Sequence, residues 1–242
     1  MRPSVPTLWS FNGGYVDTAG FLTLHGLFTS HVTGNFVTFG AAIAYGTSGA
    51  VAKLLALPMF CVVIVLARAI ANRLRPSGWP VLETAVIVKI LLLSSAAALA
   101  VGRGPFATGD GPAPLTTGMI LVAAMAIQNA ASRVHLSKAP PTTIMTGTST
   151  QLMLDIADLA TGNLTPEARA VVLPRLRAMA VAVASFALGC AVAALVFIRF
   201  EMKVFLLPPL VAAVSLLAII EARRDRGCFS RRENGRPANW EG

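Results

Sequence analysis

Residues 179–198 read MAVAVASFALGCAVAALVFI, a run that contains no charged side chain. The hydrocarbon core of a bilayer is about 30 Å thick, and a helix of roughly 20 apolar residues crosses it. Three further stretches approach or reach this length: Val51–Asn72, Thr84–Val101 and Val204–Ile220. This pattern predicts an all-α membrane protein.

The composition of the chain agrees with this prediction. Of its 242 residues, 55% are hydrophobic and only 13% are charged, and the mean hydropathy is +0.68. Soluble domains carry about a quarter of their residues as charges, so this chain has too little polar surface to cover a soluble globule. The net charge of +9 is carried at the ends of apolar runs and in the C-terminal tail. That distribution indicates contact with the lipid bilayer and not with nucleic acid.

Four further segments are less apolar. Ser10–Leu27 and Thr117–Ser132 have polar insertions but are long enough to cross the bilayer, which brings the predicted number of spans to six. Ser30–Tyr45 and Thr142–Leu159 are shorter and rich in Thr and Gly, and the second contains two aspartates. We expect these two to be short re-entrant or broken helices.

The distribution of Lys and Arg distinguishes this topology from one with eight crossings, because basic residues are concentrated in cytoplasmic loops. If the two short elements enter and leave on one side, only four basic residues lie outside and fifteen inside, with Lys89 left out as intramembrane. If all eight elements cross, the split is seven to twelve. The first topology fits better and predicts a multi-pass protein of the bacterial inner membrane with both termini in the cytoplasm.

An internal repeat joins the two short elements. Residues 28–35 (FTSHVTGN) align with residues 141–148 (PTTIMTGT) at a constant offset of 113. With three crossings in each half, the halves have opposite orientations, which predicts a 3+3 inverted repeat within one transmembrane domain (residues 1–221, halves about 8–102 and 115–221). Residues 222–242 are expected to form a basic, disordered cytoplasmic tail. Inverted repeats are common in transporters, whose binding sites lie near the bilayer midplane.

The repeated motif supplies the first candidate site residues. If each short helix begins inside the membrane, its first backbone N–H groups have no intrahelical partner, so this end has to line a cavity and suits an anion or a polar solute. Glycines allow close backbone approach, and Thr and Asn supply hydrogen bonds. The predicted residues are Thr33, Gly34, Asn35, Thr146, Gly147 and Thr148. The alternative is that these small residues only allow tight helix contact.

Ionisable groups within spans are functional candidates by default. Asp17 lies in the middle of a predicted span and His31 follows it closely, so the two could exchange a proton. A static polar contact, for example to Asn35 or Arg133, is an equally good interpretation. Gln128 and Asn129 are expected to belong to the same polar network.

Signatures of catalysis are absent from the sequence. It contains no Gly-x-Ser-x-Gly, His-Glu-x-x-His, Cys-x-x-Cys or phosphate-binding loop motif. Its three cysteines and three histidines are too scattered for a metal site. We therefore expect no enzyme activity, metal or cofactor. Lys89, near the start of its span, is expected to extend its ammonium to the cytoplasmic interface.

Several of these motifs together resemble a known family. They are GYVDTAGF at residues 14–21, the repeat motif at residues 28–35, Gln128-Asn129-Ala130 with Arg133, and Thr146-Gly147-Thr148. This set is similar to the YoaK-like family of bacterial membrane proteins, which are of unknown function and are sometimes classed as transporters. The resemblance implies a multi-pass membrane protein and carries no substrate.

These observations predict a transporter or channel for a small polar or anionic solute, with its site where the two repeat elements meet. Two alternatives remain at this point. One is a membrane-embedded enzyme or lipid-handling protein that uses Asp17 and His31. The other is a non-catalytic sensor or assembly factor. The sequence is compatible with a homo-oligomer.

Overall fold

The computed structural model describes residues 4–143, 145–162 and 164–234, with side chains described up to Asp225. Within these ranges the helices are joined by loops, and no strand occurs. In chain order the helices are α1 (Val5–Thr23), α2 (Gly34–Tyr45), α3 (Ala50–Leu74), α4 (Val81–Arg103), α5 (Pro112–His135), α6 (Met145–Thr161), α7 (Pro166–Phe200) and α8 (Leu207–Asn234). Short 3-10 helices, η1 (Arg75–Ser77) and η2 (Glu201–Leu206), follow α3 and α7.

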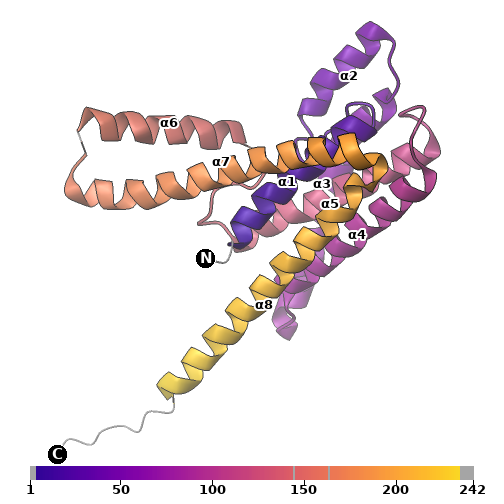
Figure 1. Cartoon of the computed structure of the whole chain (residues 1–242). Helices are drawn as coiled ribbons and strands as arrows, with labels where there is room; N and C mark the ends of the chain where they lie inside the picture. Colours follow the sequence, from indigo (N-terminus) through magenta and orange to yellow (C-terminus); the bar gives the residue numbers. More distant parts are fainter. Residues whose placement is uncertain (1–3, 144, 163, 235–242) are drawn as a thin grey trace, which may run out of the picture.

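Four stretches of the described chain are long and apolar enough to cross a membrane. They are Ala50–Ser77, α4, α5 and the continuous stretch Pro166–Asp225, which contains α7, η2 and most of α8. The chain reverses direction at η2, so α7 and α8 are separate rods (Figure 1). The count differs from the predicted six because α7 and α8 are counted together, and because α1 carries polar residues that lower its hydropathy. The fold is thus an all-helical one with several span-length apolar helices.

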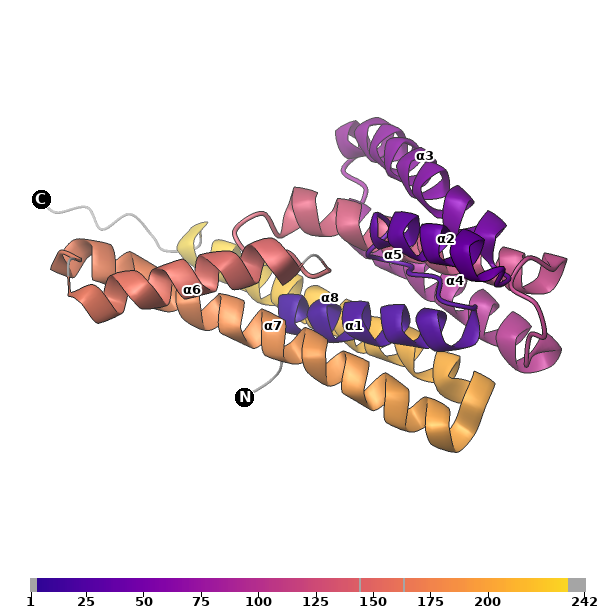
Figure 2. The ribbon, with the colours of Figure 1, turned by 90° about the horizontal axis from the view of Figure 1, so that it is seen from above.

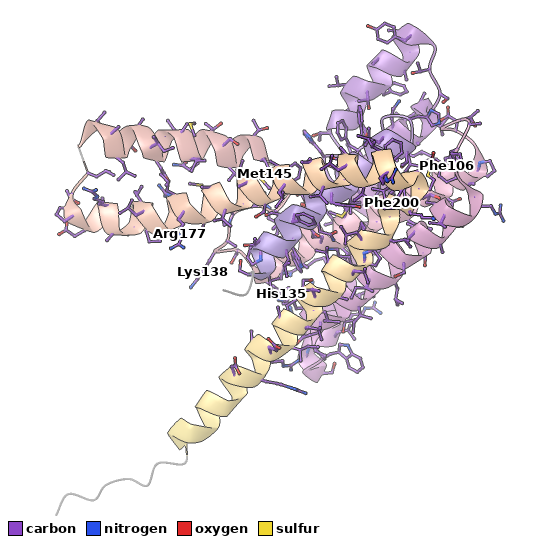
Figure 3. The ribbon with its side chains drawn as sticks, in the orientation of Figure 1. Phe106, His135, Lys138, Met145, Arg177 and Phe200 are labelled. Carbon is purple, nitrogen blue, oxygen red and sulfur yellow. The ribbon has the colours of Figure 1, made fainter. Side chains whose placement is uncertain are left out.

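The helices of the bundle share two ends. At one end the His25 ring contacts the Phe106 carbonyl oxygen at 3.0 Å, and Asp110 accepts hydrogen bonds from the N–H groups that begin α3. At the other end, Arg223 of α8 pairs with Glu83 of α4 at 2.9 Å. We call these the Phe106 end and the Lys138 end; Figure 3 labels both residues.

Helix α1 is the central helix of the bundle. It packs along α7 and also contacts α5 and α8, and Figure 2 shows it between α7 and α5. A Cβ at Gly14 would lie 2.2 Å from the Phe186 carbonyl oxygen, and one at Gly189 would lie 2.1 Å from the Phe11 carbonyl oxygen. Only glycine therefore allows α1 and α7 to approach this closely, as small residues do in membrane helices.

Two segments each leave the bundle and return to it at a single end, and the two ends are opposite. Residues 24–49, which include α2, leave the Phe106 end at His25 and return to it at Gly49. Residues 136–165, which include α6, leave from the Lys138 end, and α6 continues into the projecting hairpin with α7 (Figure 1). The sequence placed both short elements within a few residues of their observed positions.

The remaining differences concern helix lengths. Helix α7 begins at Pro166, well before the apolar run at residues 179–198, because Thr165 caps its N-terminus and Pro166 occupies its first position. Its charged first turns project from the bundle (Figure 1). Helix α8 continues to Asn234 through most of the predicted tail, and residues 235–242 lie outside the described residues.

Candidate functional site

The carboxylate of Asp17 is buried and holds the chain before α2 in place. We call residues 24–49 and 136–165, which contain α2 and α6, the first and second broken segments. Its Oδ1 accepts from the Thr29 and Ser30 backbone N–H groups, both at 2.7 Å, and from the Thr29 hydroxyl at 3.0 Å. Its Oδ2 accepts from the Ser30 hydroxyl at 2.7 Å and the His31 N–H at 3.1 Å. These N–H groups precede α2 and have no helical partner. Asp17 therefore accepts hydrogen bonds from backbone donors that a hydrocarbon environment would leave unsatisfied.

A local turn brings this segment inward. The chain leaves α1 through two residues with positive φ, His25 at 54° and Gly26 at 84°. The buried Asn35 side chain then closes the loop by accepting from the Phe28 N–H and donating to the Phe28 carbonyl, both at 2.8 Å. The His31 ring lies 5.7 Å from the Phe28 ring and is exposed. The contact between Asp17 and His31 therefore runs through the His31 backbone.

The second half contains a matching arrangement with neutral groups. The Thr143 hydroxyl donates to Asn129 Oδ1 at 2.6 Å, and Gln128 Nε2 lies 3.4 Å from the Thr142 hydroxyl. Thr142 and Thr143 stand at the repeat offset of 113 from Thr29 and Ser30. At both segments, then, polar side chains on the preceding helix bind the hydroxyl residues with which the segment begins.

Both broken segments contact one face of α1. A Cβ at Gly13 would lie 2.8 Å from the Thr142 carbonyl oxygen, and one at Gly20 would lie 2.9 Å from Thr29 Cγ2. Asp17 lies between them, and the spacing of four and three residues puts all three on one helix face. At 1.5 Å per residue, Gly13 and Gly20 are about 10 Å apart along the axis. The two segments thus approach each other from opposite ends of the bundle.

A second buried polar cluster surrounds Lys89, whose side chain is 1% exposed. Its ammonium donates to Gln128 Oε1 and lies 5.5 Å from the Trp9 ring centroid. Gln128 Nε2 donates to the Trp9 carbonyl at 3.0 Å. The expectation that Lys89 reaches the interface is wrong, because it lies eight residues into α4, about 12 Å from the helix start, and finds its partners in the core.

Two side chains beside this cluster are buried without a partner. Among the described residues, Ser10 Oγ and both side-chain atoms of Asn12 have no hydrogen bond. Asn12 adjoins Gly13, whose Cβ would lie 3.7 Å from Gln128 Nε2. Buried polar groups are normally satisfied, so Ser10 and Asn12 have unused hydrogen-bonding capacity.

The other predicted residues lie away from this centre. Thr33 is exposed and makes no capping hydrogen bond, and Gly34 begins α2 beside the Phe28 ring. Thr146 and Gly147 are exposed on α6, whereas Thr148 is buried. Gly147 and Thr148 line a cleft at the Lys138 end.

The predicted site is therefore divided into several places. Asp17 and Asn35 fix the first segment, Gln128 and Asn129 fix the second, and no hydrogen bond joins Asp17 to Gln128. The polar core also contains four residues that were not predicted from the sequence: Trp9, Ser10, Asn12 and Ser215. Trp9 Nε1 donates to Ser215 Oγ at 3.1 Å. Polar residues inside apolar spans were the available signal, and Asn12 carried it.

No group of three or more His, Cys, Asp or Glu side chains suited to a metal occurs in the part of the chain that is described. The fold and its buried polar clusters define a helical protein of the membrane-spanning class. The chain belongs to the DUF1275 family, whose description is 'Protein of unknown function (DUF1275)'. The family model matches residues 5–219. No curated protein and no solved structure gives a significant match.

Proposed function

We propose that this protein moves a small polar or anionic solute across the bacterial inner membrane, along α1 between the two broken segments. One observation carries the proposal: the segments at Thr29–His31 and Thr142–Thr143 enter from opposite ends and contact the same face of α1. Transporters with inverted repeats place their sites where such broken helices meet. The resemblance to YoaK-like proteins is in keeping with this reading.

The helix contacts support an inverted repeat of six crossings, formed by α1, α3 and α4 and by α5, α7 and α8. Helix α1 packs against α7 and α8, while α5 packs against α3 and α4. Helix α2 packs against α3 just as α6 packs against α7, and α4 faces α8. Exchanging the two halves leaves these helix pairs unchanged, as the proposed two-fold axis requires, whereas the contact of α4 with η2 has no counterpart.

The chemistry of the core supports an anion or a solute rich in hydrogen-bond acceptors. Lys89 donates to an amide oxygen, and its partners among the described residues include no carboxylate. Lys89 and the unpartnered amide of Asn12 lie in the part of the bundle reached by the second segment. A protonated amine buried without a counterion favours the entry of negative charge.

Asp17 has a positioning role in this proposal. Five donors occupy its oxygens, and the His31 ring lies against Phe28, so the geometry favours holding the first segment over acid–base chemistry.

A flux assay tests the proposal directly. The purified protein is reconstituted in liposomes, and uptake of nitrate, formate, acetate, phosphate, glycerol and urea is compared with that of protein-free liposomes of the same lipid. We expect at least one of these solutes to enter faster with the protein present. Rates equal to those of protein-free liposomes for all six would contradict transport of this solute class.

A further inference from the structure

Two hollows flank the loop from Lys138 to Pro140, beneath α7. Their volumes are about 750 and 670 Å³. We call them together the basic cleft, since both are lined by Lys138, Ala139, Pro140, Pro174 and Ala178. Figure 3 shows Lys138 and Arg177, which come from different elements, close together at this end of the bundle.

The charge of the basic cleft is positive. Arg177 lines the first hollow with Lys138, and Arg133 and Arg175 line the second. Neither lining contains an acidic side chain. Arg175 is engaged by Asp155 through bonds of 2.6 and 2.9 Å, which hold the pKa of that carboxyl below its ordinary value. Arg133, Lys138 and Arg177 are left to meet an anionic ligand.

The walls of the first hollow are largely hydrocarbon. Leu173 and Val181 of α7 line it and are 44% and 42% exposed, and Pro174 and Ala182 complete the same wall. A free inorganic anion would use only the cations and would leave this apolar surface wet. A ligand with a phosphate at one end and an acyl chain at the other fits both features.

We propose that the basic cleft binds an anionic phospholipid, with its phosphate near Arg133, Lys138 and Arg177 and an acyl chain along α7. Basic pockets between membrane helices commonly hold anionic headgroups. The same loop leads directly into Thr142 and Thr143, so the bound lipid steadies the second broken segment. This site does not depend on solute transport.

The test measures lipid binding to the purified protein in detergent by native mass spectrometry and by thermal unfolding. Phosphatidylglycerol is compared with phosphatidylcholine of the same chains and with inorganic phosphate. We expect phosphatidylglycerol to bind and to raise Tm, while the other two have little effect. The variant Lys138→Gln/Arg177→Gln should bind it about ten-fold more weakly, because charge-assisted hydrogen bonds are lost.

The matched control is Arg103→Gln/Arg199→Gln, which removes two exposed cations at the Phe106 end and should bind phosphatidylglycerol like the wild type. The single variant Arg133→Gln provides a second reading if the double variant is poorly produced. Equal stabilisation by inorganic phosphate would refute the lipid. Equal loss of binding in both double variants would show that the lipid responds to the overall positive charge and not to a specific site. Undiminished binding in Lys138→Gln/Arg177→Gln would mean that the lipid binds elsewhere.

Discussion

Asp17 illustrates how one residue supports a broken segment within apolar surroundings. Placing a carboxylate at the centre of a membrane helix costs about 2.5–3.5 kcal/mol on insertion scales. Hydrogen bonds to a charged group contribute about 1.5–3 kcal/mol each, and Asp17 accepts five. The bonds therefore offset the cost of burial. They also satisfy backbone donors that would otherwise be stranded, so the carboxylate and the broken segment stabilise each other.

The substitution Asp17→Asn should destabilise the protein. The amide nitrogen of Asn is itself a donor and would face N–H and O–H donors that now bind the carboxylate. We expect the free energy of unfolding to fall by about 2–3 kcal/mol and Tm in detergent to be lower. Asp158→Asn, an exposed aspartate on α6, is the control and should leave Tm unchanged. A wild-type Tm in Asp17→Asn, together with altered solute flux, would instead favour direct participation of this carboxylate in transport.

The role of Lys89 is tested by removing its ammonium. Lys89→Met leaves the buried Gln128 Oε1 without its donor, so we expect the variant to insert with a loss of about 1–3 kcal/mol in stability. If this ammonium attracts an anion, anion flux should fall at least about ten-fold, the equivalent of one 1.4 kcal/mol interaction. Flux of neutral solutes should change less.

The control for this variant is Arg103→Met, which removes an exposed cation at the Phe106 end. Its anion flux should match that of the wild type. Unchanged anion flux in Lys89→Met would remove Lys89 from the pathway, and equal losses in both variants would point to a general effect of positive charge.

At the scale of the helix, the contact between α1 and α7 should be the most sensitive to added volume. Gly189→Ala puts a methyl group 2.1 Å from the Phe11 carbonyl oxygen. This neighbour is a backbone atom, which cannot move aside as the end of a flexible side chain can. We expect a loss of about 1–3 kcal/mol from overpacking, seen as lower Tm and lower yield of monodisperse protein.

The matched variant is Gly102→Ala, in α4, where a Cβ would meet nothing within 4 Å. Alanine is the better helix former, so this variant should be at least as stable as the wild type. Equal stability of the two variants would mean that α1 and α7 are less closely packed than described.

The sequence was sufficient to predict the long apolar helices, because runs of that length have no alternative outside a membrane. It also located both broken segments, since Thr, Gly and Pro mark their starts. It could not predict the burial of Lys89, which depends on Gln128 and Trp9 arriving from other helices. Likewise, the length of α7 was missed because its first turns carry charges that do not distinguish a projecting helix from a loop.

At the scale of the whole molecule, helices from the two halves of the proposed repeat pack against each other. The first helix of each half packs with the later helices of the other half, as α1 does with α7 and α5 does with α3. Neither half therefore encloses its own core. Each broken segment is held by its own preceding helix, and α1 lies beside both. Movement of one half against the other would change the space along α1, which is the change that alternating access needs.

The topology of the chain tests this arrangement. The Lys138 end is expected to be cytoplasmic because fifteen basic residues then lie inside and four outside. Reporter fusions at Ser77, Lys138, Gly162 and the C-terminus should read cytoplasmic, and fusions at Tyr45 and Gly109 should read external. The pair Lys138 and Gly162 is decisive, because the two positions flank α6 and a re-entrant element leaves both on one side.

Fusions at Gly26 and Tyr45 flank α2 and provide the matching comparison at the other end. Opposite readings within either pair would mean that the helix between them crosses fully. The halves would then no longer be related by inversion, and the meeting of the two segments on α1 would lose its meaning as a transport site.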